Sequence, residues 1–185
     1  MPAQAKTSDH HIVQAARDLI ERSGAESLSM QAVADAVGIR APSLYKRFAD
    51  RAALLHAVEY ESFVSLRHTL ERAAKAGNPA RDIVEMSRAY RRFAKNHPRL
   101  YEMLFSRTAE RDTLADRARA DASIPLLERV VKLVGEERAL PSARVLTAFV
   151  HGFVSMENAG AFRLGDGLDD AFALGVSTLL RSFTR

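Results

Sequence analysis

The sequence predicts an all-α protein of about nine helices. Apolar residues recur at a spacing of three and four along nearly the whole chain, and no segment shows the sustained alternation of a β-strand. Glycine, proline and capping residues separate these periodic stretches. The 185 residues are enough for one large helical domain, or for a small domain joined to a larger one.

Composition restricts the class of protein. A hydrophobic content of 47% and a charged content of 27% are typical of a soluble globular chain, and a net charge of +4 permits an anionic partner without requiring one. The absence of cysteine excludes disulfides, thiolate nucleophiles and cysteine-bound metals. The first eleven residues lack the apolar segment of a signal peptide, and no apolar run is long enough to span a bilayer. We therefore expect a cytoplasmic protein that makes no membrane contact.

The first two helices are short and well marked. The first is expected over residues 8–23, with an apolar stripe on one side and Gly24 as its stop. Ser29 is a suitable N-cap for a second helix that runs to Val37. Gly38 then interrupts the pattern, so the chain turns before the next helix.

A third, short helix follows this turn. Leu44 and Phe48 are spaced so that they face inward. The polar positions around them face outward: Ser43, Tyr45, Lys46 and Arg47. A helix, a glycine-containing turn and a second short helix form a helix-turn-helix pattern, in which the second helix enters the major groove of DNA.

The remaining helices follow from caps and prolines. They are expected over residues 51–76 with Asp50 as the cap, 79–97 after Asn78, 100–105, 113–134 with a bend at Pro125, 141–163 opened by Pro141, and 168–183, with a charged connection before residue 113. No internal repeat or low-complexity tract interrupts this series.

Positive charge is concentrated beside the short third helix. Residues 40–51 contain four cations and one acid, a local net of +3, whereas residues 1–51 contain seven cations and six acids. Local charge of this kind suits contacts with DNA phosphates. The alternative is a solvated surface, which is the usual role of isolated charged pairs.

The stretch SLSMQAVADAVGIRAPSLYKRFADRAALLHAV resembles the N-terminal signature of the TetR family of transcriptional regulators. The LYxxF core, the small-residue turn and the preceding AxxVG all occur, over about residues 8–58. Two departures are mild: Arg51 replaces a lysine, and Met30 replaces a small polar residue that often grips phosphate. The resemblance implies base-reaching positions at Gln31, Arg40, Ala41, Pro42 and Lys46. It implies phosphate-contacting positions at Ser29, Ser43, Tyr45, Arg47 and Arg51.

The C-terminal part, AFVHGFVSMENAGAF with NHPRLYEMLF upstream, resembles the regulatory domain of a TetR subgroup with an aromatic-x-x-His-Gly pattern. The resemblance implies a DNA-binding domain over residues 1–52, and a ligand-binding and dimerisation domain over residues 53–185. It also implies a homodimer through the last two helices. The sequence itself fits a dimer, because two apolar seams occur there, and Gly152 would allow close helix approach in the first: Val145, Ala148, Phe149, Gly152, Phe153 and Met156, and then Leu168, Phe172, Val176, Leu179, Leu180 and Phe183. The expected ligand-binding residues are Phe63, Met86, Tyr90, Phe93, Tyr101, Phe105, Phe149, His151, Met156 and Asn158. For His151 and Asn158, a structural hydrogen bond is the preferred alternative.

Together these features predict a ligand-responsive regulator, a homodimeric repressor released from a palindromic double-stranded operator by a small, largely apolar effector. An enzyme is not expected, because the chain has no Glu-x-x-His tetrad, no His-x-x-x-His pair and no dinucleotide fingerprint. No metal or cofactor is expected.

A DNA-binding architectural protein without a ligand remains the alternative. The basic side of residues 79–97 is interpreted as a solvated face rather than a second nucleic-acid site. The operator, the effector, the regulated genes and the sign of control do not follow from the sequence.

Overall fold

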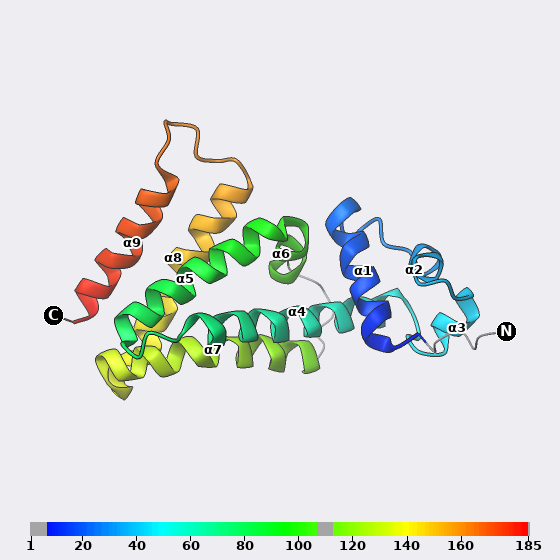
Figure 1. Cartoon of the computed structure of the whole chain (residues 1–185), viewed down its shortest axis with the longest axis horizontal. Coiled ribbons are helices and arrows are strands. Elements are labelled where there is room, and N and C mark those ends of the chain that lie inside the picture. The colour runs from blue at the N-terminus through cyan, green and yellow to red at the C-terminus, as the bar shows by residue number, and fades with distance from the viewer. Residues whose placement is uncertain (1–6, 107–112, 185) are drawn as a thin grey trace. The chain divides into compact units, whose positions relative to one another are not determined.

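The computed structural model describes residues 7–106 and 113–184, and in these ranges it contains nine α-helices and no strand (Figure 1). The all-α prediction is therefore confirmed. The chain forms two compact units: one runs up to Phe63 and adds His97–Ala118, and the other holds Val64–Asn96 and the chain from Arg119 onward. The predicted charged connection falls largely on residues 107–112, outside the described residues. Whether function divides at residues 52 and 53 stays a prediction.

The first unit contains the N-terminal helices. They are α1 (Asp9–Ser23), α2 (Met30–Ala36), α3 (Ala41–Tyr45), the first part of α4 (Arg51–Ala73), and α6 (Pro98–Phe105). The two predicted caps are confirmed: the Ser29 hydroxyl accepts from the Ala32 amide at 3.1 Å, and the Asp50 carboxylate accepts from the Ala53 amide at 2.8 Å. Because these side chains satisfy amide groups that lack helical partners, α2 and α4 begin at fixed positions.

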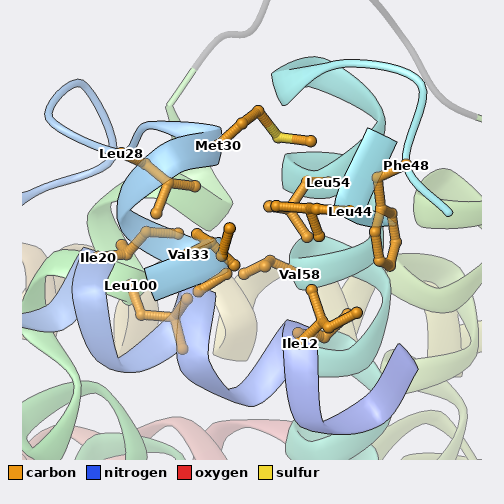
Figure 2. Packing of buried hydrophobic residues seen from close by; sticks show 13 residues of the cluster. Ile12, Ile20, Leu28, Met30, Val33, Leu44, Phe48, Leu54, Val58 and Leu100 are labelled. Carbon is orange, nitrogen blue, oxygen red and sulfur yellow. The ribbon is translucent and has the colours of Figure 1, made fainter. Parts of the chain in front are cut away.

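One apolar cluster holds this unit together (Figure 2). It joins α1, α2, α3, α4 and α6 through residues that include Ile12, Ile20, Leu28, Val33, Leu44, Leu54, Val58 and Leu100. The N-terminus of α6 is also fixed to α1, because the two carboxylate oxygens of Glu21 accept from the amides of Arg99 and Leu100, each at 3.2 Å. The short N-terminal helices and α6 therefore share one core.

The second unit is built around three helices that pack on one another: α5 (Pro79–Asn96), α8 (Glu136–Asn158) and α9 (Leu168–Phe183). It also includes the part of α7 (Thr113–Val134) from Arg119 onward, with Pro125 inside the helix. Asn78 begins α5 as predicted, since its side chain accepts from the Arg81 amide at 3.1 Å. The predicted bounds of the last helix are confirmed.

The predicted bounds of the eighth helix were wrong at both ends. It begins at Glu136, directly after Gly135, whose φ of 80° ends α7, so Pro141 lies inside the helix rather than at its start. It ends at Asn158 instead of continuing to Arg163. There Gly160 adopts φ 62°, and the Ala161 amide donates to the Met156 carbonyl at 2.9 Å. This is the glycine C-cap that closes many helices.

Arg91 on α5 is the buried polar centre of the second unit. It is 9% exposed and makes two hydrogen bonds of 2.7 Å to Glu157 on α8, and its third contact is with Asp169 on α9, also at 2.7 Å. Its guanidinium lies 5.0 Å from the centre of the Phe172 ring and 5.7 Å from that of Phe153. One side chain thus links the three helices through charge and through aromatic faces.

Within this chain, α8 and α9 approach each other closely at Gly175, whereas the role of Gly152 in a dimer stays a prediction. A Cβ at Gly175 would lie 2.1 Å from the Phe149 ring, whereas a Cβ at Gly152 would meet nothing within 4 Å in this chain. The apolar face predicted as a dimer seam on α9 also points largely inward. Phe172, Val176, Leu180 and Phe183 are all buried within the chain itself.

We predict that Glu157→Gln lowers the free energy of unfolding of the second unit by about 3 kcal/mol, because Arg91 would stay buried beside a weaker acceptor. The hydrogen bonds from Arg91 lower the pKa of the Glu157 carboxyl. This stabilisation is therefore complete above the ordinary carboxyl pKa of about 4.3 and is lost as pH falls toward the lowered folded value. Urea unfolding at neutral and acidic pH measures both effects.

The matched control is Glu85→Gln, which removes the exposed partner of Arg88 on the same helix and should cost less than about 1 kcal/mol. Equal losses in the two variants would contradict the assignment. A difference in unfolding free energy between wild type and Glu157→Gln that persists below the pKa of Glu157 in the folded protein would also contradict it.

Candidate nucleic-acid interface

The third helix is held by two apolar anchors. Leu44 is 0% exposed and Phe48 is 9% exposed, and both belong to the core of the first unit. Figure 2 shows them beside Leu54 of α4. Pro42 lies in the first turn of α3, where its missing amide hydrogen would have no helical partner. The inward face predicted for this helix is therefore confirmed.

The outward face of α3 carries hydrogen-bond donors that the fold does not use. Arg40, Ser43, Tyr45 and Lys46 are exposed, with Tyr45 at 51%. Their side chains make no hydrogen bond or ion pair with any residue in the described ranges. Pro42 is exposed and Ala41 is half-buried, so small side chains stand where a surface could approach closely. The arrangement offers several donors and little steric obstruction to an anionic ligand.

The N-cap of α2, Ser29, and Gln31 in its first turn extend this surface. The Ser29 oxygen accepts from the Ala32 amide as the N-cap, so its hydroxyl hydrogen remains available to an acceptor. Gln31 is exposed, and its side-chain nitrogen donates to the Asp35 carboxylate at 2.7 Å. The sequence predicts roles for Ser29 and Gln31 but none for Asp35, although a spacing of four residues places the Gln31 and Asp35 side chains on one helix face.

Arg47 is partly occupied by contacts to the start of α1. Its guanidinium lies 3.2 Å from the Asp9 carboxylate and donates to the Thr7 carbonyl. Its side chain retains 28% exposure. Arg47 therefore presents some of its donors to solvent, while others contact Asp9 at the start of α1 and Thr7 just before it.

Arg51 has a structural role that the sequence did not indicate. From the start of α4 it donates to the carbonyls of Leu28, at 2.8 Å, and Ala25. These carbonyls belong to the connection between α1 and α2, so Arg51 fixes the loop that leads into α2. A phosphate contact by Arg51 would have to use its remaining donor capacity.

The predicted ligand-binding residues divide between the two units. In the first unit, the Phe105 ring lies 4.8 Å from that of Tyr101 and 6.1 Å from that of Phe63. In the second unit, Met86 and Phe93 are buried, Tyr90 is half-buried, and Met156 is 48% exposed. Their role in ligand binding stays a prediction.

The remaining predicted ligand-binding residues lie on α8. Phe149 packs against the rings of Phe153 and Phe172, and Asn158 donates to the Ala94 carbonyl at 3.3 Å. Burial lowers the pKa of His151. Only Val150 separates Phe149 from His151, so the chain does not meet the expected aromatic-x-x-His-Gly pattern.

Other kinds of site have little support among residues 7–106 and 113–184. No group of three or more His, Asp or Glu side chains in these ranges could hold a metal ion. In the same part of the chain, none of the helices combines the length and apolar character that a bilayer crossing requires.

Comparison with known proteins agrees with this geometry. Residues 12–58 match the model for bacterial regulatory proteins of the tetR family, and residues 83–179 match that for a tetracyclin repressor-like C-terminal domain. An uncharacterized HTH-type transcriptional regulator of Mycobacterium tuberculosis is 32% identical over 161 residues, covering 84% of this chain and 72% of the relative.

Solved structures show the same fold at lower identity. A protein of unknown function from Rhodococcus sp. RHA1 superposes with a TM-score of 0.87 at 22% identity, covering 100% of both chains. A TetR variant from Acinetobacter baumannii AYE, in complex with minocycline, superposes with a TM-score of 0.68 at 23% identity, covering 96% of this chain and 97% of that one.

We predict that Arg51→Ala destabilises the first unit by about 2 kcal/mol, because two loop carbonyls lose a charged donor. Arg40→Ala is the matched control, since it removes an exposed arginine without a partner in the described residues and should change stability by less than about 0.5 kcal/mol. Thermal unfolding of both variants measures the difference. If Arg51→Ala were as stable as Arg40→Ala, the loop-fixing role would be wrong.

Proposed function

Because this chain belongs to the TetR family of DNA-binding transcriptional regulators, we propose that α2 and α3 read a palindromic double-stranded operator. The observation that carries this proposal is the row of exposed, unused donors held outward by Leu44 and Phe48. Members of this family are regulators rather than enzymes. A regulator of bacterial DNA would act in the cytoplasm.

The donors suit two kinds of contact with DNA. Tyr45, Arg47 and the hydroxyls of Ser29 and Ser43 are suited to phosphate oxygens, which fix the protein on the duplex. Arg51 joins this set through the donor capacity that its loop contacts leave. The base-reaching set is Gln31, Arg40 and Lys46, with Ala41 and Pro42 allowing close approach of the backbone.

We also propose a homodimer formed by α8 and α9. Support comes from exposed apolar side chains on these helices: Val145 and Met156 on α8 are each 48% exposed, and Leu174 on α9 is 63% exposed. A two-fold dimer would present two copies of α3 to half-sites about 34–36 Å apart or a multiple of that spacing. This symmetry is the reason to expect a palindromic operator.

The regulatory proposal is a repressor that a small, largely apolar effector releases. Support comes from the aromatic and methionine side chains gathered within the two units, and from the minocycline complex of the Acinetobacter relative. The helix α4 contributes residues to both units. An effector that displaced α4 would therefore also displace the residues that pack against α2 and α3. A coupling free energy of about 1–3 kcal/mol would be enough for regulation.

We predict that Tyr45→Phe and Arg47→Ala weaken binding to all DNA sequences by similar factors, because both residues would contact phosphate. Arg47→Ala should also lower the salt dependence of binding by about one unit, whereas Lys46→Ala should change base preference as well. Anisotropy titrations on selected and random duplexes at several salt concentrations measure these effects. Arg88→Ala, which removes an exposed arginine of α5, is the control and should leave the salt dependence unchanged. Unaltered binding in the three α3-region variants, with folding intact, would exclude this interface.

We predict that Leu174→Glu converts the protein to a folded monomer, because a charge would replace an exposed apolar side chain at the proposed interface. The matched control is Leu164→Glu, in the connection between α8 and α9, where the side chain is 97% exposed and no interface is proposed. Sedimentation at micromolar concentration distinguishes the two. A monomeric wild-type protein, or a dimer that survives Leu174→Glu, would contradict the proposal.

A further inference from the structure

We propose that Asp35 determines base preference by fixing the Gln31 amide in the orientation that reads adenine rather than guanine. The inference rests on the proposed DNA-reading function of α2 and α3. Gln31 lies in the first turn of α2, and Asp35 lies one turn later on the same face. Both side chains are exposed, and the Gln31 Nε2 donates to the Asp35 Oδ1 at 2.7 Å. A bond of this length to a carboxylate is a charge-assisted hydrogen bond.

The carboxylate permits only one orientation of the amide. An ionised carboxylate accepts hydrogen bonds but cannot donate, so the NH₂ group of Gln31 must face Asp35. Rotating the amide by half a turn would place the Gln31 Oε1 against the Asp35 carboxylate, bringing two acceptors together. With Asp35 in place, Gln31 presents Oε1 and one remaining N–H hydrogen to a ligand.

This pair of groups matches one purine. In the major groove, adenine offers the N6 amino group as donor and N7 as acceptor, whereas guanine offers two acceptors, O6 and N7. The Gln31 Oε1 can accept from adenine N6 while the remaining N–H donates to N7. Guanine would place O6 against Oε1 in this orientation. With its NH₂ group free, Gln31 could instead turn Oε1 away and donate both N–H hydrogens to O6 and N7, but Asp35 holds one of these hydrogens.

The Asp35 carboxylate has no other side-chain hydrogen bond or ion pair in the described residues. It does not cap α3, whose N-cap Arg40 makes no side-chain capping bond, and only the backbone carbonyl of Asp35 takes part in ending α2. A carboxylate beside a DNA-binding surface also repels phosphates. Its removal should therefore strengthen binding to all sequences while weakening discrimination between them.

The experiment first selects duplexes from a random pool with the wild-type protein, and then repeats the selection with Gln31→Ala. The position at which only wild type prefers adenine marks the base that Gln31 reads. Affinities are then measured on two duplexes that differ only there, with A·T or G·C. Wild type should prefer adenine by about tenfold or more, in line with a bidentate contact. In Asp35→Ala the ratio of the affinities for the A·T and G·C duplexes should fall to about threefold or less. Binding to both duplexes should stay equal or tighten.

Asp35→Asn and Asp18→Ala complete the design. An asparagine can accept or donate, so Asp35→Asn tolerates both amide orientations and should lose discrimination as Asp35→Ala does. Asp18→Ala removes an exposed carboxylate from α1 of the same unit, and the ratio should stay at its wild-type value. Far-UV circular dichroism confirms that each variant is folded.

Three results would overturn the inference. The first is an adenine-to-guanine ratio that Asp35→Ala and Asp35→Asn leave unchanged, since Asp35 would then act through charge alone. The second is a wild-type preference for guanine at the Gln31 position, and the third is a Gln31→Ala variant with the same selected sequences as wild type. Failure of the wild-type protein to enrich any duplex would instead refute the proposed function, so the two failures are distinguishable.

Discussion

The burial of Leu44 and Phe48 is the constraint on which the rest of the proposed interface depends. A helix of five residues is too short to be stable by itself in water. Packing of these two side chains in the core of the first unit gives α3 both its stability and its direction. Because the anchors face inward, Tyr45 and Lys46 must face solvent, and their donors are fixed by the backbone rather than by contacts of their own.

The same core makes α2 and α3 part of a larger cooperative unit. Leu100 of α6 lies in the cluster that anchors α3, and the Glu21 carboxylate fixes the N-terminus of α6 to α1. Arg51 fixes the connection before α2 from the start of α4. A displacement of α4 or α6 would therefore disturb contacts that hold α2 and α3 in place. This is the physical basis for expecting an effector to change DNA binding by a modest change in helix packing.

Sequence reasoning succeeded where a local rule determines the outcome. The cap at Ser29 and the inward face of α3 depend on nearby residues alone. It failed where packing decides: Pro141 looked like a helix start but is accommodated inside α8, and the seam proposed on α9 is largely the chain's own core. For the site, the phosphate contact of Arg51 follows from its place in the TetR signature and stays a prediction. Its loop-fixing role is not predictable, because the carbonyls that it contacts lie more than twenty positions away and leave no local signal.

The proposed function requires DNA to lie against α2 and α3 of the first unit. Hydrogen–deuterium exchange of the wild-type protein, with and without a selected duplex, tests this most directly because it follows every segment at once. We expect added DNA to slow amide exchange across α2, α3 and the start of α4, and to leave exchange unchanged on the exposed basic face of α5 around Arg88 and Arg92. Protection confined to α5, with α2 and α3 exchanging as in the free protein, would contradict the proposed function.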